Sequence, residues 1–376
     1  MTELSLYIHI PFCRRRCAYC SFVSYAERET DIPAYTRALA EEIKLRCVDD
    51  AEIKTIYFGG GTPSLMPADS LKEIFKAIRT CYKIADDAEV TLEANPGTID
   101  SGYLKTVRSL GVNRLSLGVQ SLDDAELRLL GRIHTSSEAR ESTRQAKEAG
   151  FTNLSLDFIY GIPERSQVTW RNMLAEIVTL RVQHLSLYGL TLEEDTPMHE
   201  RVERGEVPSP DPDAAASEYE MAEEVLQAAG YNQYEISNWS QPGFESRHNR
   251  VYWQRGPYLG LGAAAHSFLD NKRIANTSDL DIYISELSGG KLPPQTTEVI
   301  SKVVALSEAI ILGLRLNEGI SAGDIQAHFG IDLHHRFAVE IADCSSLGLL
   351  EEKGGRLRLT PRGRLLGNEV FMRFLA

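Results

Sequence analysis

The 376-residue sequence has no long apolar run and no excess of basic residues. Its hydrophobic runs are only of strand length, so we expect no membrane-spanning helix. Its net charge is −13, whereas broad nucleic-acid binding needs a basic surface that displaces counterions. The first residues, "MTELSLYIHIPF", show neither a basic leader nor a small-residue cleavage site. We therefore expect no signal peptide and a cytoplasmic location.

Cysteine is scarce, with six in the chain. Cys47, Cys81 and Cys344 are scattered singly, and we expect them to be buried as small hydrophobic residues. The other three lie close together in "PFCRRRCAYCSF", at positions 13, 17 and 20. Such a short polar span favours a metal ion or an iron-sulfur cluster over a disulfide.

The cysteine cluster lacks a fourth thiol. A closed zinc site needs four ligands, and no second CxxC or HxxxH pair follows downstream, although His9 remains a candidate fourth ligand. A four-iron cluster held by three thiolates keeps one iron open to another ligand. The pattern therefore favours an open metal centre over a structural zinc site.

Strand-like and helix-like segments alternate through the first half of the chain. Helical patterns at 34–47, 71–82 and 136–151 fall between six strand patterns, at 4–10, 55–61, 89–95, 114–120, 153–161 and 184–191. This alternation predicts an α/β fold with a parallel sheet. The recurring "LSLY", "LSLG" and "LSLD" favour a barrel or partial barrel, with an open sheet as the alternative. Each predicted strand ends in polar residues or glycine. Because the carboxyl ends of parallel strands meet at one end of a barrel, this predicts a functional site there.

Composition changes after about residue 207, and we predict three parts. They are a core at 1–235, a loop-rich connector at 236–295, and a small α+β, winged-helix-like domain at 296–376 with a hairpin at Gly354-Gly355. That last domain has nine basic and ten acidic residues, so it lacks the basic footprint of a DNA-binding module. A structural cap is the favoured interpretation.

The motif C-x3-C-x2-C, together with "YIHIPFC" before it and "GGGTP" at 59–63, resembles the cluster loop of the radical S-adenosylmethionine (SAM) superfamily. This resemblance implies a partial (β/α)6 TIM-like barrel, with a [4Fe-4S] cluster on Cys13, Cys17 and Cys20 and SAM at the open iron. Nearly the whole chain is similar to the branch that contains oxygen-independent coproporphyrinogen III oxidase (HemN) and the heme chaperones HemW. By this resemblance, the residues near SAM are Tyr7, Tyr19, Gly60, Gly61, Thr62, Glu93, Gln120, Arg132 and Asp157.

Two departures from the oxidase point to the chaperones. Phe22 stands where the oxidase has a further cysteine, and the segment before the cluster loop is shorter. Residues 248–253 also fit the HNxxYW motif of HemW. The resemblance thus implies a protein that binds heme and delivers it to respiratory-chain hemoproteins. It also implies a reducing electron donor, and it is compatible with peripheral contact with a membrane. The alternatives are oxidative decarboxylation of the propionates of coproporphyrinogen III, or a radical SAM reaction on another substrate.

The motif supplies the heme candidates His248, Tyr252 and Trp253, in a region that reads as a loop. Histidine can ligate heme iron, and aromatic rings can pack on a porphyrin. The alternative is an aromatic lid or core segment around a hydrogen-bonded histidine. Four roles are open for Arg14, Arg15 and Arg16. They offset the negative charge of the cluster, bind the propionates of heme, contact an acidic electron donor, or form a solvated loop without a specific role.

Overall fold

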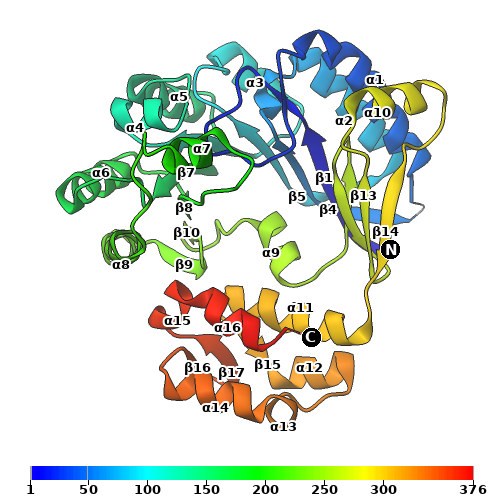
Figure 1. The fold of residues 1–376 in the computed structure, drawn as a ribbon. Helices are drawn as coiled ribbons and strands as arrows, with labels where there is room; N and C mark the ends of the chain where they lie inside the picture. The colour runs from blue at the N-terminus through cyan, green and yellow to red at the C-terminus, as the bar shows by residue number, and fades with distance from the viewer. Residues whose placement is uncertain (1, 49, 376) are drawn as a thin grey trace.

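A twisted sheet of parallel strands forms the centre of the molecule (Figure 1). The computed structural model describes residues 2–48 and 50–375. Six parallel strands are neighbours in the order of the sequence: β1 (Thr2–Ile10), β4 (Ala51–Gly60), β5 (Lys83–Ala94), β6 (Arg114–Gln120), β7 (Leu154–Tyr160) and β8 (His184–Gly189). Strand β8 pairs with β7 and β10 and not with β1, so the barrel is partial, as predicted.

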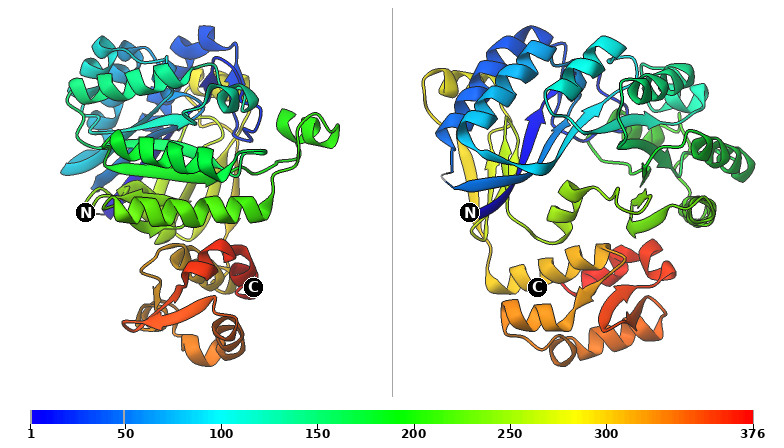
Figure 2. Two further views of the ribbon diagram at one scale, coloured as in Figure 1. Left: turned by 90° about the vertical axis from the view of Figure 1, so that its left-hand side faces the viewer. Right: turned by 180° about the vertical axis from the view of Figure 1, so that it is seen from behind.

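Helices cover the outer face of this sheet (Figures 1 and 2). They are α1 (Ile32–Leu45), α2 (Ala68–Cys81), α3 (Ser101–Ser109), α4 (Asp124–Leu129), α5 (Ser136–Glu148), α6 (Gln167–Thr179) and α8 (Pro212–Ala228). The start of α5 follows from its sequence, because Thr135 and Glu138 form a reciprocal capping box. The six predicted strands and three predicted helices are all present; most of their ends lie within two residues of the prediction, and the largest shift is at the start of β5, which begins at Lys83 instead of Glu89.

Short elements complete the core. They are β2 (Phe12–Cys13) paired with β3 (Tyr25–Ala26), the 3-10 turns Glu29–Asp31 and Pro63–Leu65, and α7 (Pro197–Glu203). Among residues 2–48 and 50–375, no helix is both long and apolar enough to cross a bilayer.

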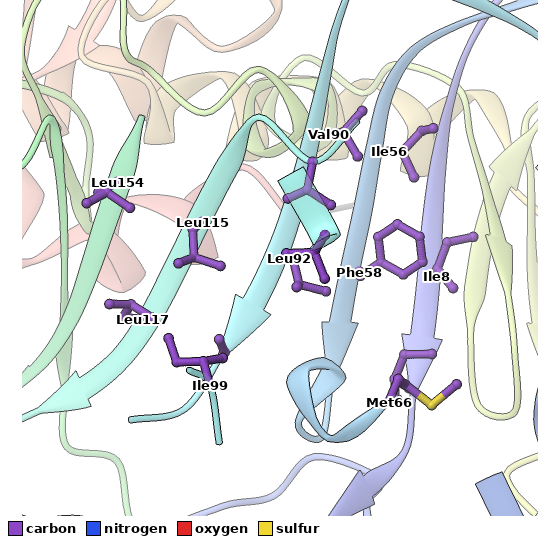
Figure 3. Packing of buried hydrophobic residues seen from close by; sticks show 14 of the residues in the cluster. Ile8, Ile56, Phe58, Met66, Val90, Leu92, Ile99, Leu115, Leu117 and Leu154 are labelled. Carbon is purple, nitrogen blue, oxygen red and sulfur yellow. The ribbon is translucent and has the colours of Figure 1, made fainter. Parts of the chain in front are cut away.

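The Leu/Ser alternation of the strands separates two environments. The leucines and isoleucines point outward and pack beneath the helices; Figure 3 shows Ile8, Ile56, Leu92, Leu115 and Leu154 among them. Because side chains alternate along a strand, the intervening positions face inward. Those inward positions are polar or aromatic: Tyr7, His9, Thr55, Tyr57, Glu89, Thr91, Glu93, Arg114, Ser116, Ser155, Asp157, His184, Ser186 and Tyr188. The barrel interior is therefore a polar lumen and not an apolar core.

The segment 236–295, which the sequence presents as loop-rich, largely extends the main sheet. Strands β9 (Asn232–Glu235) and β10 (Asn238–Ser240) continue the sheet beyond β8. At the other edge β11 (Tyr258–Leu261) pairs in parallel with β1, followed by β12 (His266–Leu269), β13 (Lys272–Asn276) and β14 (Gln295–Val299). Helix α10 (Leu280–Ser288) packs on α1. The HNxxYW motif lies in helix α9 (Arg247–Trp253) and not in a loop.

The C-terminal residues form a second unit with its own hydrophobic core. It contains a three-stranded sheet, in the order β15-β17-β16. Its elements are α11 (Lys302–Arg315), β15 (Ile320–Ser321), α12 (Ala322–Phe329), α13 (Leu333–Arg336), α14 (Ala338–Ser346), β16 (Leu350–Lys353), β17 (Arg356–Leu359), α15 (Pro361–Leu365) and α16 (Gly367–Arg373). The predicted hairpin is present, with Gly354 and Gly355 both at positive φ. Figures 1 and 2 show this unit beyond the amino ends of the core strands, next to α9.

The prediction for the scattered cysteines is correct only for Cys344, which is buried. Cys47 is exposed, and its thiol donates to the backbone carbonyl of Cys81 at 2.9 Å; Cys81 itself is half-buried. Cys81 is the last residue of α2 and packs against the edge of the main core, whereas Cys47 follows the end of α1.

Candidate functional site

The three clustered cysteines line one cavity of about 450 Å³ at the carboxyl ends of the core strands. The loop that carries them is held by backbone bonds from neighbouring segments. The Gly61 and Thr62 amides donate to the carbonyls of Ile10 and Phe12, each at 2.8 Å. On the other side of the loop, Ala18 donates to Leu130 at 3.0 Å. The predicted position of the site, at one mouth of the sheet, agrees with this geometry.

Arg132 and Thr62 contact the sulfurs directly. Arg132 Nη1 donates to Cys17 Sγ at 3.2 Å, while its Nη2 donates to Asn95 Oδ1 and to the Gly118 carbonyl. The hydroxyl of Thr62 lies 3.5 Å from Cys13 Sγ and accepts from Asn95 Nδ2 at 2.9 Å. Arg132 stays charged, because the nearby Tyr19 and Cys17 outweigh the effect of its burial and its pKa is raised.

The glycines after β4 bring backbone close to the cluster loop. Gly60 has φ = +110°, and a Cβ there would lie 2.5 Å from the ring of His9. A Cβ on Gly61 would lie 2.7 Å from the Phe12 carbonyl oxygen. Only glycine fits this turn, and both residues line the cavity.

Glu93 lies in the wall of the cavity. Tyr57 donates its hydroxyl to Glu93 Oε1 at 2.6 Å. Burial raises the pKa of Glu93 to about 7, against the opposing effect of the Tyr57 hydrogen bond. Glu93 therefore changes charge near neutral pH.

Asp157 and Gln120 complete the predicted polar wall. The Asp157 carboxylate accepts hydroxyl groups of Ser116 and Ser155 at 3.1–3.2 Å, and burial raises its pKa. Gln120 ends β6 at φ = +68°, a conformation unusual for a residue other than glycine. Both line the cavity.

The two predicted tyrosines differ in position. Tyr19 lines the cavity, whereas Tyr7 is absent from its lining and has its hydroxyl 3.0 Å from His9 Nδ1. Tyr7 also stacks with Tyr57 and His248. It therefore belongs to an aromatic layer below the cavity wall.

His248 belongs to the floor of the barrel, at the amino ends of the strands. It is 1% exposed, with Nδ1 2.7 Å from Thr55 Oγ1 and Nε2 2.8 Å from Tyr252 Oη. The Glu89 carboxylate accepts the His248 and Arg247 backbone amides at 3.0 Å. Trp253 packs instead under Arg315, whose guanidinium carbon is 4.2 Å from the ring centroid. In this conformation both His248 nitrogens already have partners.

Sequence reasoning placed Asn95 at a polar strand end of the predicted mouth without giving it a role, and it did not single out Arg114, Ser116, Ser186 or Asn249. Asn95 bridges Arg132 and Thr62, and Arg114, Ser116, Ser186 and Asn249 line the lower part. The available signal was the period-2 alternation, which places the serines and Arg114 of the "LSL" strands on one face.

Comparison with known proteins defines the family. Residues 7–177 match the Radical SAM superfamily, and residues 300–366 match the HemN C-terminal domain. The chain is 34% identical to the heme chaperone HemW of Bacillus subtilis (strain 168), over 99% of both chains. It is 36% identical to heme chaperone HemW of Mycobacterium tuberculosis (strain H37Rv), over 97% of this chain and 93% of the relative. The chain belongs to the HemW family within the radical SAM superfamily.

The fold comparison agrees with this assignment. Coproporphyrinogen III oxidase (HemN) from Escherichia coli superposes with a TM-score of 0.87, over 100% of this chain and 90% of the oxidase. Their sequences are 23% identical, so this likeness supports the fold alone. The predicted α/β architecture, a radical SAM partial barrel with a small C-terminal domain, is confirmed.

Membership of the radical SAM superfamily implies a [4Fe-4S] cluster and SAM, and the donor set fits such a cluster. Within residues 2–48 and 50–375, no three His, Cys, Asp or Glu side chains converge on a point where one metal ion would sit. A four-iron cluster instead takes each thiolate on a different iron, so its sulfurs must stand apart around a shared space. Cys13, Cys17 and Cys20 do so, around one cavity.

The rim of the cavity is both apolar and basic. Phe22 is 66% exposed and lines the opening. Arg14, Arg15 and Arg16 are exposed beside it. Within the part of the chain that the structure describes, none of the three forms an ion pair.

Proposed function

We propose that this protein is a heme chaperone that acts in the cytoplasm. It binds a [4Fe-4S] cluster, SAM and heme, and it delivers heme to respiratory-chain hemoproteins. The observation that carries the proposal is similarity to proteins named heme chaperone HemW over essentially the full length of both chains. Phe22, in place of a further cysteine, supports the same assignment.

In this proposal Cys13, Cys17 and Cys20 hold three irons of the cluster and leave the fourth open. The turn at Gly60-Gly61, with Thr62, lets backbone approach SAM closely. Glu93, Gln120, Arg132 and Asp157 offer hydrogen-bonding groups from the wall, Tyr19 offers a ring in the cavity, and Tyr7 supports that wall from below. When bound and reduced, the cluster supplies the electron that cleaves SAM in this superfamily.

Heme binds, in our proposal, at the opening of this cavity. Phe22 and Tyr188 offer exposed apolar surface there. Arg15 and Arg16, which form no ion pair among the described residues, suit propionate groups, because a guanidinium binds a carboxylate through two parallel hydrogen bonds. Ligation of the heme iron by His248, with Tyr252 and Trp253 beside the porphyrin, stays a prediction, and it requires both His248 hydrogen bonds to break.

The reducing electron donor is expected to be an acidic redox protein. The arginines of the cluster loop form an exposed cationic surface next to the cysteines, in a chain of net charge −13. Opposite charge at such a surface would raise the association rate and make it salt-dependent.

Anaerobic incubation of the reconstituted protein with SAM, reductant and coproporphyrinogen III separates the two main functions. We expect no protoporphyrinogen and stoichiometric heme binding in the visible spectrum. Formation of protoporphyrinogen would establish the oxidase function instead. Replacement of His248 by alanine in the heme-loaded protein then tests its role, since an unchanged Soret band removes His248 as an axial ligand.

A further inference from the structure

We propose that Cys47 and Cys81 are a redox-active pair, which closes to a disulfide by exchange with a small disulfide such as oxidised glutathione. The pair lies at the ends of α1 and α2, and neither cysteine lines the cavity of the cluster cysteines. The inference concerns a modification site outside the radical SAM centre and does not depend on the proposed heme function.

The contact between the two cysteines is the first observation. Cys47 is exposed, and its thiol donates to the carbonyl oxygen of Cys81 at 2.9 Å. Cys81 is the last residue of α2 and is half-buried. Two cysteines that are 34 positions apart in the sequence therefore meet at one place.

A second contact holds the two main chains together beside the sulfurs. The hydroxyl of Tyr82 donates to the carbonyl oxygen of Arg46 at 2.8 Å. Arg46 directly precedes Cys47 and Tyr82 directly follows Cys81, and helices α1 and α2 pack against each other. A disulfide needs this proximity, because its two Cα atoms must lie within about 7 Å of each other.

The two thiols differ in how they meet a reagent. Burial, together with a hydrogen bond to Cys47, raises the pKa of the Cys81 thiol to about 11. Cys47 is exposed, and thiol-disulfide exchange needs both access and a thiolate. We therefore assign Cys47 as the thiol that reacts first and Cys81 as the thiol that resolves the product.

The exchange takes place in two steps. The thiolate of Cys47 attacks one sulfur of oxidised glutathione, and one glutathione leaves as its thiolate. Cys81, as a thiolate, then attacks the Cys47 sulfur of this mixed disulfide and displaces the second glutathione. The protein pair loses two protons and two electrons, and oxidised glutathione becomes two thiols. A reducing cytoplasm keeps the pair open, whereas an oxidising shift closes it.

Closure would constrain the segment next to the cluster loop. The segment between the two cysteines contains β4, the glycine turn at 60–62 and most of α2. A cross-link across such a segment restricts the unfolded chain, so the oxidised protein should be more stable than the reduced protein.

The competing explanation is that Cys47 only caps helix α2. The last carbonyl groups of a helix lack partners within the helix, and a thiol donor satisfies one of them here. Cys47→Ser keeps a donor at this position and cannot form a disulfide, so it separates the two explanations.

The test equilibrates the full-length protein, anaerobically, in glutathione buffers of increasingly oxidising potential. Free thiols are then alkylated and the tryptic peptides are mapped by mass spectrometry. Trypsin places Cys47 and Cys81 in separate peptides, 47–54 and 80–83, so a linked pair is identified directly. We expect these two peptides to become linked in the wild type, while the buried Cys344 stays a free thiol as the internal control.

The serine variants test the assigned roles. In Cys81→Ser, Cys47 should accumulate as a mixed disulfide with glutathione, because no second thiol resolves it. In Cys47→Ser, Cys81 should stay unmodified in the same buffers. The linked wild type should unfold at a temperature several degrees above that of the reduced wild type, and Cys47→Ser should show no such rise on oxidation.

Separate glutathione adducts on Cys47 and Cys81 without the linked peptides would overturn the pair, as would two free thiols in the most oxidising buffer. Either result would leave capping of α2 as the role of Cys47. If a serine variant does not fold, the peptide map of the wild type decides alone. Equal unfolding temperatures of linked and reduced wild type would overturn the stabilising effect of closure.

Discussion

One side chain, that of Arg132, connects the cluster loop to the barrel wall. It donates to Cys17 Sγ, to Asn95 and to the carbonyl of Gly118. Hydrogen bonds and positive charge at cluster sulfurs stabilise the reduced, more negative state. Arg132→Met should therefore lower the reduction potential of the cluster, as measured by an EPR-monitored redox titration. Arg128→Gln, at an exposed position of α4, is the control, and equal potentials for Arg132→Met and wild type would contradict this role.

The raised pKa of Glu93 predicts that the stability of the protein depends on pH. Its pKa is raised to about 7 in the folded protein from an ordinary value of 4.5, mainly by burial. Between those values the folded state binds more protons than the unfolded state, so the free energy of unfolding falls as pH rises from 4.5 to 7. The loss is at most about 1.4 kcal/mol per pH unit in that interval.

Glu93→Gln keeps a hydrogen-bond acceptor for Tyr57 and removes this titration. Its stability relative to wild type should increase from pH 5 to pH 7 and then level off, in denaturant unfolding followed at each pH. Parallel pH profiles of the two proteins would show that Glu93 keeps its ordinary pKa.

At the scale of single residues, sequence reasoning depends on the pattern around each position. The cysteines, the glycine turn and Arg132 stand in recognisable motifs, and the structure brings them to one cavity. Asn95 and Arg114 carry no such motif. Their importance arises from neighbours on other strands, such as Thr62 for Asn95 and Thr91 for Arg114, and the sequence alone does not state those distances.

The turn after β4 is the element most constrained by its glycines. In Gly61→Ala the new Cβ would lie 2.7 Å from the Phe12 carbonyl oxygen, and backbone there cannot move without losing the bond from Gly61 to Ile10. We expect a loss of about 1–3 kcal/mol in stability, as for an overpacked core, and a lower iron content per chain. Gly323→Ala in α12 is the matched control, since its Cβ meets only Ser321 Oγ, at 3.5 Å. Wild-type iron content in Gly61→Ala would contradict this constraint.

Elements were predictable where local pattern and tertiary packing agree. The alternating strands and α5, with its capping box, follow from sequence because their own residues specify them. Helix α9 reads as a loop because it has only seven residues of mixed character, and isolated helices of that length are unstable. Its bonds to Thr55 and Glu89 hold it, and those residues are more than 150 positions away. Strand β11 was missed for the same reason, since its pairing with β1 spans the chain.

At the scale of the whole molecule, ion pairs and backbone hydrogen bonds at several places join the barrel to the C-terminal unit. Backbone bonds run from Ile236 to Arg315 and from Asn317 to Tyr234. Arg315 lies 3.6 Å from the fully buried Glu235 side chain and packs over Trp253. Because α9 carries Trp253, the same contacts connect the C-terminal unit to the floor of the lumen. The two cores should therefore unfold together.

Arg315→Met tests this coupling. It leaves the buried Glu235 without its counter-charge, which typically costs about 3–5 kcal/mol. Burial already raises the pKa of Glu235 against the effect of Arg315, and the variant raises it further. The folded state then takes up a proton as pH falls towards the ordinary value of 4.5, so the destabilisation should be largest at neutral pH and shrink on acidification. Scanning calorimetry should show one transition for wild type and two for the variant at neutral pH.

The double variant Glu235→Gln/Arg315→Met separates charge from packing. It removes the uncompensated carboxylate, so its loss should be smaller than that of Arg315→Met alone and independent of pH. Arg171→Gln removes an exposed pair with Glu224 and should change stability by less than about 0.5 kcal/mol. A single transition in Arg315→Met, with a loss as small as that of Arg171→Gln, would mean that backbone bonds and apolar packing join the two units without this ion pair. The floor of the lumen, and Asn249 with it, would then be positioned by α9 independently of the C-terminal unit.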